Sequence, residues 1–397
     1  MSLNSTPSSD RTHIGFFGKR NSGKSSLLNA VTNQDISIVS DYKGTTTDPV
    51  FKAMELLPLG PVMIIDTPGI DDEGELGLMR VKKAKQILNK TDIAVLVVDC
   101  RDGLSDVDYE LIEIFKKKDV DYIIVYNKSD LPHDEKILDE NEIYVSAKEK
   151  TNIDNLKNKI ASFNKPSDKK IVGDMIDKND IVVLVTPIDS AAPKGRLILP
   201  QQQTIRDILD AGAINVVVKE DMLESTLSSL SRKPGMVITD SQVFEKVAEI
   251  VPENIPLTSF SILMARYKGF LENAVRGVSE IKNLKDGDTV LVSEGCSHHR
   301  QCGDIGTEKI PNWIKSFTNK NINFEFSSGT YFPDDLSKYS LIIHCGGCML
   351  NEREIKYRMK CAQDQNVPFT NYGTVIAFLH SILKRSLEIF PDLQKMI

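Results

Sequence analysis

The sequence predicts an α/β protein of three domains, each a mainly parallel sheet flanked by helices. Short apolar runs typical of buried strands alternate with amphipathic stretches along most of the chain. This alternation is typical of parallel sheets with crossover helices. The length of 397 residues exceeds what one hydrophobic core usually spans, and a polar, Pro-containing stretch at 165–170 suggests a linker. We expect domains at 12–164, 173–256 and 257–397.

The composition favours a globular protein of the cytoplasm. Charged residues make up 26% of the chain and hydrophobic ones 41%. No apolar run approaches the roughly 20 residues that cross a bilayer, and the polar first eleven residues do not resemble a secretion signal. The net charge of −7 argues against nucleic-acid binding. In a reducing compartment, six cysteines indicate metal binding or catalysis more than disulfides.

The first motif follows an apolar strand expected at 14–17. Residues 18–25 are GKRNSGKS, which matches G-x-x-x-x-G-K-S/T at every fixed position, and a helix is expected at 26–31. Backbone N–H groups and the helix N-terminus can cradle phosphates there, while Lys24 reaches β- and γ-phosphate oxygens and Ser25 binds Mg²⁺. The predicted nucleotide-binding residues of this loop are Gly18, Asn21, Ser22, Gly23, Lys24, Ser25 and Ser26.

Two further strand ends complete the predicted nucleotide site. A strand at 62–65 leads to Asp66-Thr67-Pro68-Gly69, which places a carboxylate near the metal and a flexible glycine near a γ-phosphate. Strands at 93–99 and 122–126 follow, and the second ends in Asn127-Lys128-Ser129-Asp130. The first domain is therefore predicted to be a P-loop nucleotide-binding domain, with Lys24, Asp66 and Gly69 in catalysis.

The motif at 127–130 resembles the guanine-selecting motif of GTPases, and the residues at 146–148 resemble the motif that closes on the base. The resemblance implies GTP, with the Asp130 carboxylate accepting the guanine N1 and N2 protons. The base-binding residues that it implies are Asn127, Lys128, Asp130, Ser146, Ala147 and Lys148.

Residues 44–48, GTTTD, are similar to the first switch of GTPases related to the tRNA-modifying protein TrmE. This resemblance implies a catalytic Thr46 that binds Mg²⁺, although that family usually has Arg where Thr47 stands. It also implies that Asn21 helps to bind a potassium ion. No Gln follows Gly69, so the group that positions the attacking water is unassigned, with Glu73 or Glu75 as candidates, and slow hydrolysis is expected.

The middle region predicts a second α/β domain without a chemical site. Strands are expected at 180–186, 215–218 and 235–239, with a helix at 201–211. No cysteine, histidine or phosphate-binding pattern accompanies them. An assembly role is the remaining expectation.

The third domain carries a predicted metal site. Long helices are expected at 259–283 and 374–389, with shorter helices at 310–319 and 351–363 and a further strand at 323–326. The strand at 289–292 precedes EGCSHH at 294–299, and the strand at 340–343 precedes HCGGC at 344–348. Because the carboxyl ends of parallel strands meet at one edge, these clusters should converge. The predicted ligands are Cys296, His298, His344, Cys345 and Cys348.

The spacing of these ligands alone leaves zinc and an iron–sulfur cluster open. The backbone N–H groups of Gly346 and Gly347, just before a helix, favour an anionic cluster. Either histidine can ligate the metal or support a ligand. Cys302 is a candidate spare thiol, whereas Cys100 and Cys361 are expected to serve in packing.

A TrmE-like GTPase, an α/β middle domain and a C-terminal C-x-H…H-C-x-x-C together resemble the FeFe-hydrogenase maturation GTPases, the HydF family. The resemblance implies a scaffold that carries the diiron precursor, made with two radical-SAM maturases, to apo FeFe-hydrogenase. It implies a 4Fe-4S cluster on three cysteines and a homodimer, or a larger assembly, formed through the middle domain. The alternatives are a zinc-stabilised regulatory GTPase in RNA modification or ribosome assembly, and a redox sensor whose cluster controls GTP hydrolysis.

Overall fold

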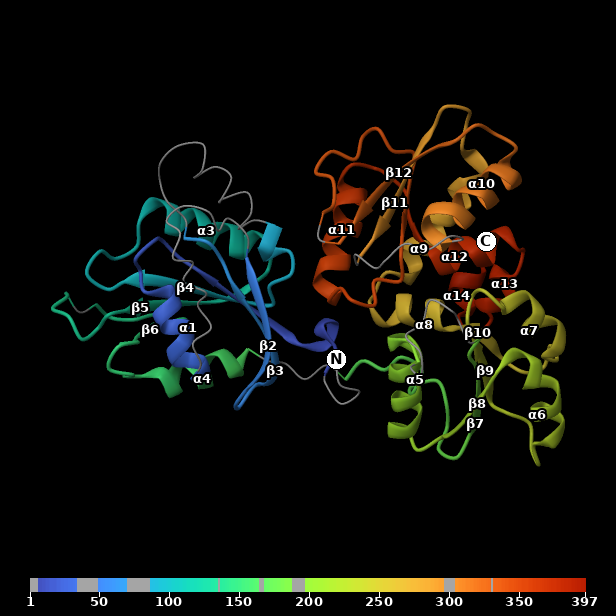
Figure 1. Cartoon of the computed structure of the whole chain (residues 1–397), viewed down its shortest axis with the longest axis horizontal. Coiled ribbons are helices and arrows are strands. Elements are labelled where there is room, and N and C mark those ends of the chain that lie inside the picture. The colour runs from blue at the N-terminus through green and yellow to red at the C-terminus, as the bar shows by residue number, and fades with distance from the viewer. Residues whose placement is uncertain are drawn as a thin grey trace. The chain divides into compact units, whose positions relative to one another are not determined.

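The computed structural model divides into two compact units, residues 1–167 and 168–397, each considered by itself. It describes residues 6–33, 49–69, 86–134, 136–163, 168–187, 197–295, 304–329 and 331–397. The predicted site residues Thr46, Cys296 and His298 lie outside the described residues, and so do the candidates Glu73, Glu75 and Cys302. Figure 1 shows the three sheets in chain order, and the prediction of mainly parallel sheets flanked by helices is confirmed.

The first unit is built on a six-stranded sheet in the order β2-β3-β1-β4-β5-β6. Every pairing is parallel except that of β2 with β3. A short 3-10 helix, η1 (Ser8–Asp10), precedes the sheet. The strands are β1 (Thr12–Phe17), β2 (Val50–Leu56), β3 (Gly60–Asp66), β4 (Ile93–Asp99), β5 (Asp121–Asn127) and β6 (Glu142–Tyr144).

Helices cover both faces of this sheet, and each face has its own core. Helices α1 (Lys24–Thr32) and α4 (Ile153–Ser162) bury Leu27 and Leu156 against one face. Helix α3 (Asp106–Lys117) buries Phe115 against the other. A capping box at Ser105 fixes the start of α3. The carboxyl ends of the parallel strands β1, β3, β4 and β5 are thus left to form the nucleotide site.

The second unit begins with a four-stranded parallel sheet in the order β10-β9-β7-β8. Its strands are β7 (Ile181–Val185), β8 (Ile214–Val218), β9 (Met236–Thr239) and β10 (Leu257–Ser259). Its helices are α5 (Leu199–Asp210), η2 (Glu220–Met222), α6 (Leu223–Ser229), α7 (Phe244–Ile250) and α8 (Phe260–Tyr267). Because β10 pairs with β9 and α8 packs into the same core as α5, this layer continues past Pro256.

The third sheet is parallel, in the order β12-β11-β13-β14. Its strands are β11 (Thr289–Glu294), β12 (Asn323–Ser328), β13 (Leu341–His344) and β14 (Phe369–Asn371). One continuous core joins it to its helices, which are α9 (Leu271–Val278), η3 (Ser279–Asn283), η4 (Ile305–Lys309), α10 (Ile310–Thr318), α11 (Glu352–Asp364), α12 (Tyr372–Leu379), α13 (Leu383–Ser386) and α14 (Pro391–Gln394).

Two long helices expected in the third domain are each broken into shorter ones, so those predictions were wrong. The helix expected at 259–283 stops after α8, where Gly269 adopts a φ of +74°, and restarts as α9. The helix expected at 374–389 stops after α12, where Ser381 adopts a φ of +59°. Left-handed residues end helices because they turn the backbone out of the α-helical path.

Among the described residues, no helix combines the length and the apolar character needed to span a bilayer.

Candidate functional site

The phosphate loop packs tightly against two strands of the first sheet. Gly18 and Gly23 have positive φ angles, +146° and +85°. A Cβ on Gly18 would lie 2.3 Å from the backbone oxygen of Val97, and one on Gly23 would lie 2.2 Å from Asn127 Nδ2. The two glycines of the motif are therefore required by close backbone approach as well as by conformation.

The predicted metal-binding carboxylate faces the loop lysine. Asp66 ends β3, and its Oδ1 lies 3.1 Å from Lys24 Nζ. This oxygen is buried and has no partner with hydrogen-bond geometry among the described residues. Ser25 lies in the first turn of α1, beside Lys24. A carboxylate oxygen and a hydroxyl group of the phosphate loop are ligand types that a hard cation such as Mg²⁺ prefers.

Asn127 links three parts of the nucleotide site. The side chain is 1% exposed, and its Nδ2 donates to the carbonyl oxygens of Ser22 at 3.1 Å and Gly23 at 3.3 Å. Its Oδ1 accepts from Ala147 N at 3.1 Å. One amide therefore joins the phosphate loop to both base-recognition segments.

Lys128 extends the same link through a residue that the sequence analysis missed. Lys128 Nζ lies 2.7 Å from the carbonyl oxygen of Asn21 and 2.7 Å from Asp99 Oδ2. Arg101 also pairs with Asp99, and chiefly through that hydrogen bond the pKa of the Asp99 carboxyl falls well below its usual range. The sequence offered one signal, because Asp99 ends one predicted strand and Lys128 follows the next, and the structure places Asp99 in register with Asn127.

Ser146 fixes the carboxylate of Asp130, the residue predicted to recognise guanine. Ser146 Oγ donates to Asp130 Oδ1 at 2.6 Å, and this bond lowers the pKa of the carboxyl. Ser146 Oγ also accepts from Glu149 N at 3.0 Å, which shapes the turn that contains Lys148. Asp130 is therefore an ionised acceptor at neutral pH, as guanine recognition requires.

The described start of the first cysteine motif, Glu294 and Gly295, lies beside the second motif at the carboxyl ends of β11 and β13. Strands β11 and β13 are neighbours, with Ser293 in register with His344. Cys345 N donates to Ser293 O at 2.9 Å, and Gly295 N donates to Cys345 Sγ at 3.0 Å. The residue directly before Cys296 thus touches the second motif.

Two described cysteines, Cys345 and Cys348, belong to the predicted metal site, and among the described residues no group of three or more His, Cys, Asp or Glu side chains is placed to hold a metal ion. Gly347 N lies 3.4 Å from Cys345 Sγ, so this sulfur faces two backbone N–H donors. Burial and the neighbouring Cys345 raise the pKa of the Cys348 thiol, whereas the charge of Lys268 opposes the rise. A buried thiol is deprotonated most readily by a metal, and N–H donors stabilise the resulting thiolate.

His344 is fully buried, and both of its ring nitrogens have protein partners. Nδ1 lies 2.7 Å from Cys345 O, and Nε2 lies 3.2 Å from Arg358 Nη1. Burial first, then the Arg358 charge, lower the pKa of His344 to about 3. Arg358 is itself fully buried and paired with Glu354 at 2.9 Å. In this arrangement the neutral ring supports the backbone of Cys345.

A tyrosine and a glutamate, to which the sequence analysis gave no role, lie beside the same site. Tyr372 OH donates to Glu294 Oε1 at 3.2 Å, and Glu294 is 3% exposed. Burial first, then the charges of Cys345 and Glu294, raise the pKa of Tyr372 above its ordinary value. The phenol therefore stays protonated and acts as a donor.

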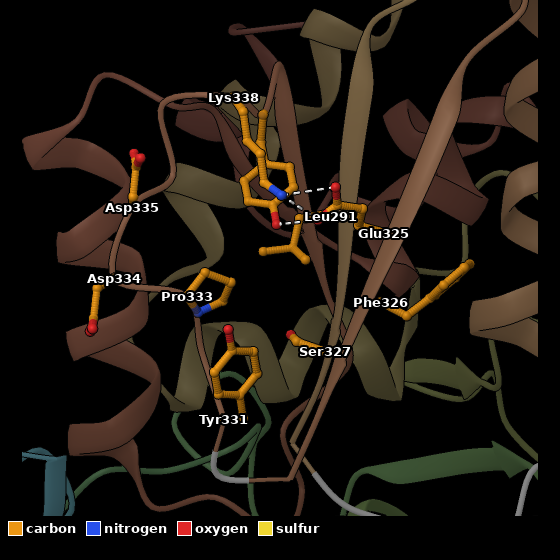
Figure 2. A pocket seen from close by; sticks show the side chains of 10 residues that line it. Leu291, Glu325, Phe326, Ser327, Tyr331, Pro333, Asp334, Asp335 and Lys338 are labelled. Atoms are coloured by element: carbon orange, nitrogen blue, oxygen red, sulfur yellow. Dashed lines mark hydrogen bonds and ion pairs between the residues drawn. The ribbon is translucent and has the colours of Figure 1, made fainter. Parts of the chain in front are cut away.

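A separate hollow of about 420 Å³ lies along the edge strand β12 (Figure 2). Lys338 and Tyr339 both bond Glu325 at one end, while Tyr331 stands at the other. Ser327 in its wall donates to Ser293 Oγ at 2.9 Å. None of the described residues that line it is a cysteine or a histidine, so its chemistry differs from that of the thiol site.

Three family models match successive parts of the chain. Residues 272–389 match the hydrogen maturase F tetramerization domain, and residues 171–269 match the hydrogen maturase F dimerization domain. Together these two matches span more than half of the chain. The chain belongs to the HydF family. Residues 13–128 match the model described as 50S ribosome-binding GTPase, so this HydF carries an N-terminal P-loop GTPase domain.

Two GTPases that resemble this HydF each match about a third of the chain. GTPase Der of Kosmotoga olearia is 34% identical over 145 residues, covering 34% of this chain and 33% of that protein. The tRNA modification GTPase MnmE of a Thermoanaerobacter species is 38% identical over 154 residues, covering 36% of this chain and 32% of that protein. The chain thus spans a third of the length of these relatives.

The solved structure of Era from Aquifex aeolicus bound to GDP.AlF4- has 26% sequence identity and a TM-score of 0.34, covering 39% of this chain and 57% of that one. The predicted resemblance to TrmE-like GTPases and to HydF is confirmed. The HydF domains connect this GTPase to hydrogenase maturation and to oligomer formation, and they do not favour the zinc-stabilised alternative.

Proposed function

We propose that this HydF is a GTP-hydrolysing scaffold that binds a four-iron cluster and carries a diiron precursor to apo FeFe-hydrogenase. The observation that carries the proposal is the contact from Gly295 N to Cys345 Sγ at 3.0 Å, which supports convergence of the two cysteine motifs. Cys296, Cys345 and Cys348 would bind three irons. The fourth iron would then have no cysteine and could accept another ligand or the precursor.

The nucleotide chemistry rests on the residues around the phosphate loop. Lys24 would neutralise the β- and γ-phosphates, and Ser25, Thr46 and Asp66 would hold Mg²⁺. The metal would offset the charge that develops on the transferred phosphoryl group. Asn21 would help to bind potassium, which would supply a further positive charge.

The proposal includes a route by which nucleotide state would affect the cysteines. The segment after residue 167 is bound at two places in the second unit. Lys169 Nζ contacts Glu352 Oε1 at 2.5 Å, in the first turn of α11, and α11 follows Cys348 closely. Arg266 bonds Ile171 O at 3.2 Å and pairs with Asp174. A displacement of the segment that begins at residue 168 would therefore shift the N-terminus of α11 through the Lys169–Glu352 contact.

Partner binding belongs to the same proposal. We infer that two radical-SAM maturases supply the precursor and that apo-hydrogenase receives it. For self-association, β8 is an edge strand of the middle sheet, and its Ile214 and Val217 are 46% and 43% exposed. An apolar strand edge favours pairing with another strand.

The first experiment is anaerobic reconstitution with iron and sulfide, followed by metal and sulfide analysis and an absorption spectrum. We expect acid-labile sulfide and a charge-transfer band near roughly 400 nm. Cys345→Ser and Cys348→Ser should lose both, whereas Cys361→Ser, on the flank of α11, should keep them. Zinc without sulfide would contradict the proposal.

The second experiment joins the two activities. Reconstituted chain, loaded by the maturases, is mixed with apo-hydrogenase, and hydrogen production is measured with GTP or without nucleotide. An Asp130→Asn variant that hydrolyses no GTP but activates hydrogenase fully would remove the GTPase from delivery. Loss of activation with retained cluster would support coupling.

A further inference from the structure

Lys268 is a buried cation under the second cysteine motif. It follows α8 directly and is 3% exposed. Its Nζ donates to the carbonyl oxygens of Gly347 at 2.9 Å and Leu350 at 2.5 Å, which flank Cys348. Its backbone N bonds Met264 O at 3.0 Å, so the end of a packed helix fixes where the side chain starts.

Gly347 connects this ammonium to a thiol. Its carbonyl accepts from Lys268, while its N–H points to Cys345 Sγ at 3.4 Å. Gly347 has a φ of +60°, and a Cβ there would lie 2.4 Å from Ile355 Cδ1 on α11. The turn is therefore confined between α8 and α11, and a change at Lys268 is passed to the donor that faces Cys345.

The ammonium of Lys268 places a positive charge against the two carbonyl groups that flank Cys348. The site is buried, and charges interact more strongly there than in water. Three thiolates outweigh the two positive charges of an oxidised four-iron core, and reduction adds one more negative charge. An anionic cluster on this turn would thus be attracted to Lys268, more strongly in its reduced form.

We propose that Lys268 is a positioning residue that both holds the Cys345–Cys348 turn and raises the reduction potential of the bound cluster. The inference rests on the proposed function, since it concerns the same cluster. Residue 268 would thus tune the cluster from outside the cysteine motifs. It lies at the end of α8, a helix that packs on the sheet of β7, β8, β9 and β10.

The test separates the hydrogen bonds that Lys268 makes to the Cys345–Cys348 turn from the effect of its positive charge. Lys268→Gln keeps an N–H donor for a carbonyl oxygen and removes the charge, Lys268→Met removes both, and Lys268→Arg keeps both. The matched control is Lys246→Gln, at an exposed position on α7. The full chains are reconstituted anaerobically, iron and sulfide are counted, and the midpoint potential is measured by a redox titration followed by electron paramagnetic resonance.

We expect the Gln variant to bind the cluster at a more negative midpoint potential than wild type. We expect the Met variant to shift similarly and also to lose iron at least tenfold faster to a chelator. The Lys268→Arg variant should keep the wild-type potential because it keeps the positive charge. The Lys246→Gln control should match wild type in both measurements.

Several outcomes would overturn the inference. If the Lys268→Gln variant has the wild-type midpoint potential, the charge of Lys268 does not set the potential. If the Lys268→Met variant releases iron at the wild-type rate, Lys268 does not hold the Cys345–Cys348 turn. If neither variant folds by circular dichroism, the Lys268→Arg variant decides, because a folded Arg variant with a shifted potential contradicts the charge argument. Absence of any cluster in wild type would instead refute the proposed function.

Discussion

Replacing Asn127 by Ala should damage the GTPase domain more than any exposed substitution, because one amide joins three segments. The change removes the bonds to Ser22 O, Gly23 O and Ala147 N. At about 1 kcal/mol for each of these three bonds, the N-terminal unit should lose about 3 kcal/mol of stability. The site is 1% exposed, so water cannot easily replace the lost partners.

Hydrogen exchange of the full chain, followed by mass spectrometry of peptides from β1 and α1, measures the opening free energy of this unit directly. GTP affinity, measured with a fluorescent analogue, should fall by roughly 100-fold or more, since about 3 kcal/mol of loop anchoring is lost. Asn155→Ala, on the exposed side of α4, is the matched control and should leave both values unchanged. The reasoning fails if the Asn127→Ala variant opens no more easily and binds GTP within about threefold of wild type.

Three other predictions concern the base, the pH and the oligomer. Asp130→Asn should weaken GTP binding by roughly 100-fold and improve xanthosine triphosphate binding, because the new amide can donate to the xanthine 2-oxygen; equal preference for both nucleotides would contradict this. Burial first, then the Lys90 charge, lower the pKa of His13 from 6.5 to about 4, against the Arg11 carbonyl contact at 2.9 Å. The unfolded chain therefore takes up the proton first, and the N-terminal unit should lose about 3 kcal/mol of stability between pH 6.5 and pH 4, with no further loss from this group below pH 4; a His13→Gln variant with the same pH slope in hydrogen exchange would refute this. Ile214→Lys should reduce self-association in mass measurements, and an unchanged mass distribution would exclude the β8 edge as a contact.

The P-loop GTPase domain could be predicted from sequence because its motifs are local and lie at strand ends, whereas the roles of the individual site residues remain predictions. Strand β4 was predicted with its observed bounds, 93–99, and the carboxyl end of β5 placed Asn127 correctly. The contribution of Asp99 was missed, since its partner Lys128 follows the end of a different strand, β5. The residue types within one motif are enough to predict its ligand. An ion pair between residues at the ends of two strands depends on the register of those strands, which cannot be read from the sequence.

The ends of the helices in the third domain could not be predicted from the sequence. The apolar pattern from 259 to 283 continues across Gly269, so periodicity alone cannot detect the break. The chain bends there because α8 belongs to the core of the middle sheet, whereas α9 belongs to the core of the third. Short strands such as β10 and β14 were missed for a related reason, since three residues carry too little pattern to distinguish a strand from a loop.

The break after α8 also explains why a lysine can lie under the cysteine turn. A continuous helix would carry residue 268 along the helix axis, and its side chain would follow the helical repeat. Because the helix ends at Tyr267 and Gly269 turns the backbone, Lys268 instead reaches the carbonyls of Gly347 and Leu350. The residue that sequence periodicity assigned to the middle of a helix is thus placed at the junction of two cores, within contact of the turn that connects Cys345 to Cys348. A Gly269→Ala variant, strained at its φ of +74°, should therefore disturb cluster binding as well as stability, and cluster content equal to wild type in a folded variant would contradict this link.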